Sequence, residues 1–141
     1  MSTLQPAVAN AITTWHKMIA AKNLSELPAM VRTDAVFHSP MAYRPYASAH
    51  AVVLILNTVI GVFENFKYHR ELASEDGLSV VLEFSATVGD KQLKGVDLIQ
   101  FDADGKIVEF EVMVRPMSGL QALAQEMGTR LAQTLPAFMK S

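Results

Sequence analysis

Cysteine is absent from this chain of 141 residues. Without thiols there is no disulfide framework, no thiolate nucleophile and no cysteine-ligated metal site, and the reducing cytoplasm is the compartment that we expect. Long hydrophobic runs are also missing. The longest apolar stretch, residues 51–56, is far too short to span a bilayer, and the N-terminus lacks the basic region and apolar run of a signal peptide. We therefore expect a cytoplasmic protein that does not bind membranes.

Positive and negative charges nearly balance as well. The formal net charge is −2 and the isoelectric point is near 6.0, so the chain has no general attraction for nucleic acid. Its four histidines lack the spacing of metal ligands, and no phosphate-binding or dinucleotide motif is present. We expect no metal, no cofactor and no nucleic-acid partner.

The composition that remains is typical of one compact domain. Half of the residues are apolar and 18% are charged, which argues against disorder. The length suits a single domain over residues 1–141, with a core over about 6–127 and residues 128–141 as a C-terminal extension.

Apolar residues at helical spacing come first in the chain. The pattern predicts helices over residues 6–22, over 25–32 with Ser25 as the cap, over about 48–63 with Ser48 as the cap, and after Pro116 with an interruption at Gly128. A short strand is expected over 35–39, followed by a loop over 41–47 that is a candidate lid.

From Phe66 onward the period changes towards two, which predicts four long antiparallel strands. Two turn signals fix their pairing: Gly89-Asp90 is typical of a two-residue hairpin, and residues 102–106 (DADGK) place a glycine where φ is positive. If the first hairpin is tight, residue 97 lies opposite residue 82. Helices first and a strand meander afterwards indicate an α+β fold, a strongly bent, mainly antiparallel sheet wrapped around the N-terminal helices as a cone.

One carboxylate interrupts an otherwise apolar strand. Asp97 shares its predicted face with Leu82 and Phe84, and an unpaired buried carboxylate is costly. We interpret this face as the wall of a pocket. The opposite face also carries apolar residues, Val96 and Leu98 beside Val81, which predicts a homodimer through the outer face of the sheet.

The element order, Trp15 on the first helix, residues 37–40 (FHSP) and residues 95–110 (GVDLIQFDADGKIVEF) resemble the nuclear transport factor 2-like, or cystatin-like, superfamily. The resemblance is to its ketosteroid-isomerase and polyketide-cyclase branch. It implies that Asp97 matches an aspartate that acts as an acid/base in the cyclases. In the isomerase the matching aspartate is kept neutral at pH 7 and donates a hydrogen bond to an oxyanion. Trp15 stands at the position of the isomerase's oxyanion tyrosine, and Ser39 at that of its general-base aspartate.

These observations predict a site for an apolar small molecule. Its catalytic residues are expected to be Asp97 and His38, the latter placed at the pocket mouth by the resemblance. The expected lining comprises Trp15, Ile19, Tyr43 as part of the lid, Leu56, Phe84, Phe101 and Val112. Each of these residues also has a purely structural interpretation. Asp97 could be a hydrogen-bonded carboxylate of the core, and His38 a residue at a strand end. The lining residues could simply pack the core or a loop.

Three functions remain open. The first is a cofactor-independent isomerase, cyclase or related enzyme that uses Asp97. The second is a binding module of the same shape that holds an apolar ligand without converting it. The third is a dimeric protein-interaction module. A fold of this kind supports many chemistries, so the three functions have to be distinguished by the residues of the site.

Overall fold

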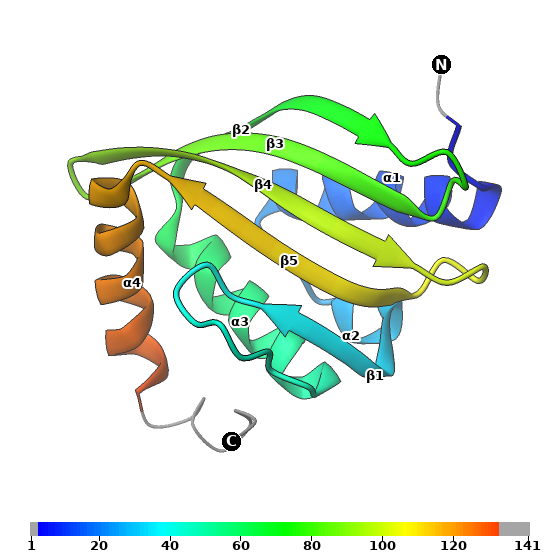
Figure 1. The fold of residues 1–141 in the computed structure, drawn as a ribbon, viewed down its shortest axis with the longest axis horizontal. Coiled ribbons are helices and arrows are strands. Elements are labelled where there is room, and N and C mark those ends of the chain that lie inside the picture. Colours follow the sequence, from blue (N-terminus) through cyan, green and yellow to red (C-terminus); the bar gives the residue numbers. More distant parts are fainter. Residues whose placement is uncertain (1–2, 133–141) are drawn as a thin grey trace.

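The computed structural model describes residues 3–132 of the chain. Its helices and strands follow one another in the order drawn in Figure 1. The helices are α1 (Pro6–Ala21), α2 (Leu27–Met30), α3 (Ala49–Val62) and α4 (Met117–Leu131). The strands are β1 (Val31–His38), β2 (Glu64–Ala73), β3 (Ser79–Val88), β4 (Lys91–Phe101) and β5 (Ile107–Arg115). None of the helices in residues 3–132 combines the length and apolarity that crossing a bilayer requires.

The strands form one open sheet in the order β1-β5-β4-β3-β2. The four long strands are antiparallel to their neighbours, and β1 joins the edge parallel to β5. Figure 1 shows α1 and α3 behind the sheet, with α4 standing at one end. The predicted α+β architecture is confirmed, and the apolar core lies between the sheet and these helices.

Local turn chemistry sets the register of the central strands. Gly89 and Gly105 both have positive φ, 61° and 79°, at the two predicted hairpin turns. Leu82 lies opposite Asp97, as the tight first hairpin predicts. The Ser48 side chain accepts a hydrogen bond from the Ala51 backbone N–H at 3.2 Å, and so caps α3 as predicted.

The second predicted helix is wrong in its extent. We expected it over 25–32, but α2 ends at Met30, and Ser25 is not its cap. The following residues form β1 instead, which begins at Val31, four residues earlier than predicted. Val31 pairs with Ile107 of β5 and is buried there, so sheet pairing outweighs the helical pattern.

The predicted interruption at Gly128 is also wrong, because α4 continues to Leu131. A glycine costs a helix interior about 1 kcal/mol relative to alanine, and the buried side chains of Met127 and Leu131 hold the last turns against the core. Most of the predicted C-terminal extension, residues 133–141, lies outside the described residues.

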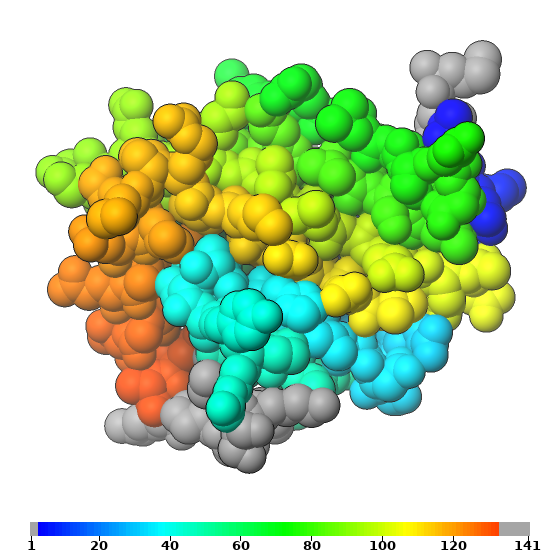
Figure 2. All heavy atoms as spheres, viewed as in Figure 1, coloured from blue at the N-terminus to red at the C-terminus, as the bar shows by residue number. Residues whose placement is uncertain are grey.

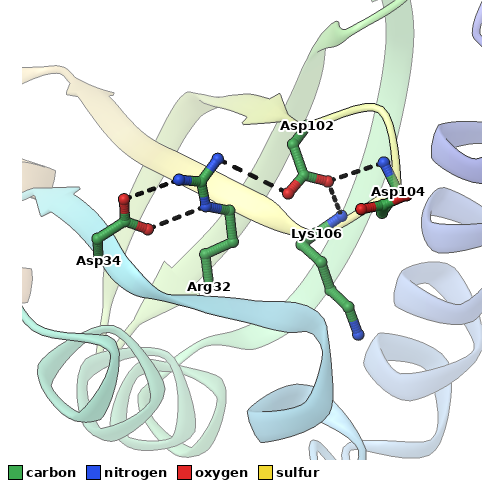
Figure 3. Close-up of polar contacts among 5 residues, drawn as sticks. All are labelled: Arg32, Asp34, Asp102, Asp104 and Lys106. Atoms are coloured by element: carbon green, nitrogen blue, oxygen red, sulfur yellow. Dashed lines mark hydrogen bonds and ion pairs between the residues drawn. The ribbon is translucent and has the colours of Figure 1, made fainter.

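The turn between β4 and β5 is tied to the start of β1 (Figure 3). Within the turn, the Asp102 carboxylate accepts the backbone N–H groups of Asp104 and Lys106, each at 2.9 Å. Arg32 on β1 forms a bidentate pair with Asp34 at 2.9 and 2.8 Å, and its other nitrogen lies 3.7 Å from Asp102. These contacts anchor the parallel edge strand to the central hairpin.

Candidate functional site

A cavity of about 70 Å³ lies between the inner face of the sheet and the helices. Residues of α1, α3 and α4 form one side of it, and residues of β1, β2, β4 and β5 form the other. Nearly all of its lining is apolar: the lining residues are Trp15, Ile19, Lys22, Leu24, Phe37, Ser39, Pro40, Met41, Ile55, Leu56, Val59, Ile60, Phe63, Phe66, Tyr68, Asp97, Phe110, Val112, Leu123 and Met127. A space of this character suits an apolar molecule held by a few polar contacts.

A chain of three polar side chains crosses the cavity wall. The indole Nε1–H of Trp15 donates to the phenol oxygen of Tyr68 at 2.8 Å. The Tyr68 hydroxyl in turn donates to Asp97 Oδ2 at 2.9 Å. The chain therefore links α1, β2 and β4, and each member fixes the next. Because these bonds lie in a poorly solvated interior, the Asp97 carboxyl has a defined orientation.

Burial dominates the electrostatics of Asp97. Its exposed fraction is only 7%, and desolvation raises its pKa to about 7, against the lowering effect of the hydrogen bond from Tyr68. The same burial, together with the negative charge on Asp97, raises the pKa of Tyr68 well above its usual value. At neutral pH the phenol therefore stays protonated, whereas both forms of the carboxyl are populated.

One oxygen of Asp97 accepts no hydrogen bond from residues 3–132. The hydrogen bond from Tyr68 uses Oδ2. Within residues 3–132, no side-chain oxygen or nitrogen is both buried and without a hydrogen-bond partner. Oδ1, which accepts no hydrogen bond from this part of the chain, therefore keeps some exposed surface, and Asp97 is a lining residue of the cavity. Oδ1 is the Asp97 oxygen that remains available to a ligand.

Tyr68 is the residue of this candidate site that the sequence interpretation missed. The alternation of Phe66, Lys67 and Tyr68 places a phenol on one face of a predicted strand, and this was the available signal. To identify Asp97 as its hydrogen-bond partner, the pairing of β2 with β3 and of β3 with β4 has to be known. Tyr68 lies opposite Phe84, and Phe84 lies opposite Gly95 on the far side.

The structure brings together most of the predicted lining. Trp15, Ile19, Leu56 and Val112 line the same cavity as Asp97. Phe84 and Phe101 do not line it, although both are buried, with exposed fractions of 1% and 2%. Both belong to the hydrophobic core.

Phe84 supports the cavity from behind. Its ring stacks on Phe66, which does line the cavity, with ring centroids 5.2 Å apart.

His38 and Tyr43 lie elsewhere. Successive residues of a strand point to opposite faces, so with Phe37 facing the cavity the His38 side chain lies on the outer face, hydrogen-bonded to Glu109. The Tyr43 side chain is fully exposed. Both residues line a separate open hollow beside β5. The structure does not bring either of them to Asp97.

Few polar groups other than the bonded chain reach the cavity. Its titratable lining residues are Lys22, Tyr68 and Asp97, so in the described part of the chain Asp97 is the only carboxylate there. The Ser39 hydroxyl accepts the Met41 backbone N–H at 3.0 Å. Within residues 3–132, no three His, Cys, Asp or Glu side chains lie close enough together to hold a metal ion.

The comparisons with known proteins agree with this architecture. A family model described as a SnoaL-like domain matches residues 12–110. No curated protein matches the chain. A steroid delta-isomerase of known structure from Pseudomonas aeruginosa is 60% identical, with a TM-score of 0.92 and coverage of 96% of this chain and 99% of that one.

Two further structures are similar at greater distance. An uncharacterised protein with a cystatin-like fold from Silicibacter pomeroyi is 28% identical, with a TM-score of 0.85 and coverage of 96% of both chains. The epoxide hydrolase/cyclase-like enzyme SalBIII is 16% identical, with a TM-score of 0.64 and coverage of 79% of this chain and 92% of that one, a likeness in fold alone. This chain belongs to the SnoaL-like domain family, within the nuclear transport factor 2-like superfamily.

Proposed function

We propose that this protein is an enzyme that moves a proton on an apolar, carbonyl-containing ligand, with Asp97 as the group that carries the proton. The observation that supports this most directly is that the two oxygens of the Asp97 carboxyl have different environments. Oδ2 is held by Tyr68, while Oδ1 accepts no hydrogen bond from residues 3–132, and Asp97 lines the apolar cavity. A pKa of about 7 lets the same group accept and release a proton at neutral pH.

The chemistry needs one acid/base group. Ionised Asp97 takes a proton from a carbon next to the ligand carbonyl, and the electron pair left behind delocalises onto the carbonyl oxygen as an enolate. Neutral Asp97 then returns the proton to another carbon of the conjugated system, which gives an isomer of the same formula. The shift is complete with Asp97 alone, so we propose it without a cofactor.

Tyr68 and Trp15 act as positioning residues in this scheme. Their hydrogen bonds hold the carboxyl, and the Tyr68 donation limits how far burial raises the pKa of Asp97. The phenol here comes from β2, whereas the first helix contributes an indole.

The similar steroid delta-isomerase suggests a steroid as the substrate. For the proton shift proposed here, we choose a steroid ketone whose β,γ double bond moves into conjugation. The experiment follows such a steroid ketone by the ultraviolet absorbance of its conjugated product. Asp97→Asn keeps the shape but removes the acid/base, and we expect it to lower kcat at least 100-fold. Asp90→Asn, on an exposed carboxylate of the turn between β3 and β4, is the control. Full turnover by Asp97→Asn would overturn the proposal.

One observation favours a second function, a binding module without turnover. Within residues 3–132, the cavity has a single carboxylate. Ser39 stands where the resemblance places a general base, but its hydroxyl oxygen accepts a hydrogen bond from the Met41 backbone N–H. For this function, native mass spectrometry of the undenatured protein should reveal a co-purified apolar molecule that stays chemically unchanged on incubation. In that case Asp97→Asn alters the affinity and no ligand is converted.

We also propose that the protein forms a homodimer through the outer face of its sheet. Val81, Val96 and Leu98 are only half-buried there, and Met113 is 51% exposed. Glu83 is ion-paired within the chain to Arg70 and Lys94, at 2.8 and 3.2 Å, so its charge is already compensated beside this apolar surface. An apolar centre of this kind suits a self-complementary contact.

A further inference from the structure

A second hollow adjoins the cavity. It has a volume of about 310 Å³ and lies between α3, α4 and the loop that follows β1. Figure 2 shows this loop and α4 next to each other at one end of the molecule. Four residues line both spaces: Ser39, Met41, Ile55 and Met127. The cavity at Asp97 and this groove therefore adjoin each other at these four residues.

Two of the shared residues are methionines. Met41 is 40% exposed, and its sulfur lies 3.6 Å from the Ser39 hydroxyl. Met127 is buried on α4. Unbranched thioether side chains change rotamer readily and adapt to irregular neighbours, which is the freedom that displacement by a ligand would require.

The groove beyond the methionines is suited to an apolar chain. Its other lining residues carry no charge: Ala42, Tyr46, Ala124, Gly128, Leu131 and Ala132. Gly128 adds no side chain to this lining, and a Cβ at this position would meet no atom of residues 3–132 within 4 Å.

We propose that Met41 and Met127 form a partition that a long ligand displaces, so that the site takes an elongated molecule. Its carbonyl lies at Tyr68 and Asp97, and its unbranched apolar tail passes the methionines into the groove beside α4. This inference rests on the proposed carbonyl site, and it names the class of ligand, a long-chain ketone, that fits the cavity and the groove together.

The test measures binding of straight-chain 2-alkanones of 6 to 14 carbons. Trp15, the one tryptophan of the chain, lies in the cavity wall and reports binding by its fluorescence. Each methylene that enters the groove should lower Kd about three- to fourfold, as burial of a CH₂ group does elsewhere. Gly128→Phe places a ring in the groove and should abolish this gain. Thr129→Phe adds the same ring on an exposed neighbour of the same helix and should preserve it.

The outcomes separate the inference from the proposed function. Short ketones that bind, with no gain in affinity for longer chains and no effect of Gly128→Phe, would overturn the elongated ligand and leave the carbonyl site intact. No binding by any 2-alkanone would overturn the elongated ligand, and the turnover assay on the steroid ketone then tests the proposed function separately. A gain with length that Gly128→Phe removes and Thr129→Phe retains supports the inference.

Discussion

Tyr68 on β2 donates a hydrogen bond of 2.9 Å to Asp97 on β4, although β3 lies between their strands. The bond crosses β3 on the inner face of the sheet, where Phe84 lies opposite both Tyr68 and Gly95. Because Gly95 has no side chain, the Phe84 ring can lie over β4 there: a Cβ on Gly95 would be 2.7 Å from the ring. The Tyr68–Asp97 hydrogen bond and Gly95 therefore lie next to the same residue, Phe84, on the inner face of the sheet.

Tyr68→Phe removes the middle of the polar chain. The Trp15 indole N–H loses its acceptor, and an unsatisfied buried donor costs about 1–3 kcal/mol, so we expect the free energy of unfolding to fall by this amount. Tyr68 also lowers the pKa of Asp97, so that pKa should rise further in the variant. Urea denaturation and a pH–rate profile measure the two effects. Tyr43→Phe, on a fully exposed phenol, is the control, and equal stabilities of the two variants would contradict the account.

Asp97 should make the protein less stable as the pH rises. Its folded-state pKa of about 7 exceeds the ordinary value of 3.8, so the folded chain binds more protons than the unfolded chain between these values. The free energy of unfolding should therefore fall across this window and level off above it, by a total of roughly 4 kcal/mol at 1.36 kcal/mol per pKa unit.

Asp97→Asn removes that dependence. The variant should match the wild type near pH 4 and exceed its stability at pH 8, as measured by urea denaturation at both pH values. An unchanged difference between wild type and variant across the range would argue against a buried, titrating Asp97.

Gly95→Ala tests the close packing behind the site. The added Cβ would lie 2.5 Å from the Met113 carbonyl oxygen and 2.7 Å from the Phe84 ring, so backbone or ring must move. Overpacking of this kind costs about 1–3 kcal/mol, which thermal unfolding would detect. Gly128→Ala, where a Cβ meets no atom of the described residues within 4 Å, provides the comparison and should not destabilise the protein. If the two variants unfold alike, the crowding at Gly95 is not real.

The homodimer gives a mass prediction. Sedimentation at micromolar concentration should give about twice the chain mass of 15.5 kDa. Leu98→Lys places a charge in the apolar outer face beside Glu111, its cross-strand neighbour, and should weaken association at least tenfold. Thr13→Lys, on an exposed position of α1, is the matched control. A monomeric wild type would refute the dimer.

The predictable part of this structure is the part set by local chemistry. The turn glycines at 89 and 105 need positive φ, and the Gly89-Asp90 turn alone brings Leu82 opposite Asp97. The pairing of strands that are distant in the sequence cannot be read from local patterns. The β2–β3 register shifts between Tyr68 and Glu71, so the reach of Tyr68 to Asp97 does not follow from loop length.

His38 shows a second limit. The resemblance placed it at the pocket mouth, but strand alternation after the inward-facing Phe37 turns it to the outer face and to Glu109. The neighbouring Ser39 reaches the cavity in its place. A single residue step separates the two faces of a strand, and the sequence alone does not say which residue of the FHSP motif leaves the strand.

The most direct test of the account is an NMR titration of the Asp97 side-chain carboxyl from pH 3 to pH 9, assigned with the Asp97→Asn variant. The account predicts a midpoint near 7, because the carboxyl is buried beside an apolar cavity, and a shift of that midpoint when an apolar ketone binds. A midpoint near the ordinary value of 3.8, unchanged by the ketone, would contradict it and place Asp97 in contact with water.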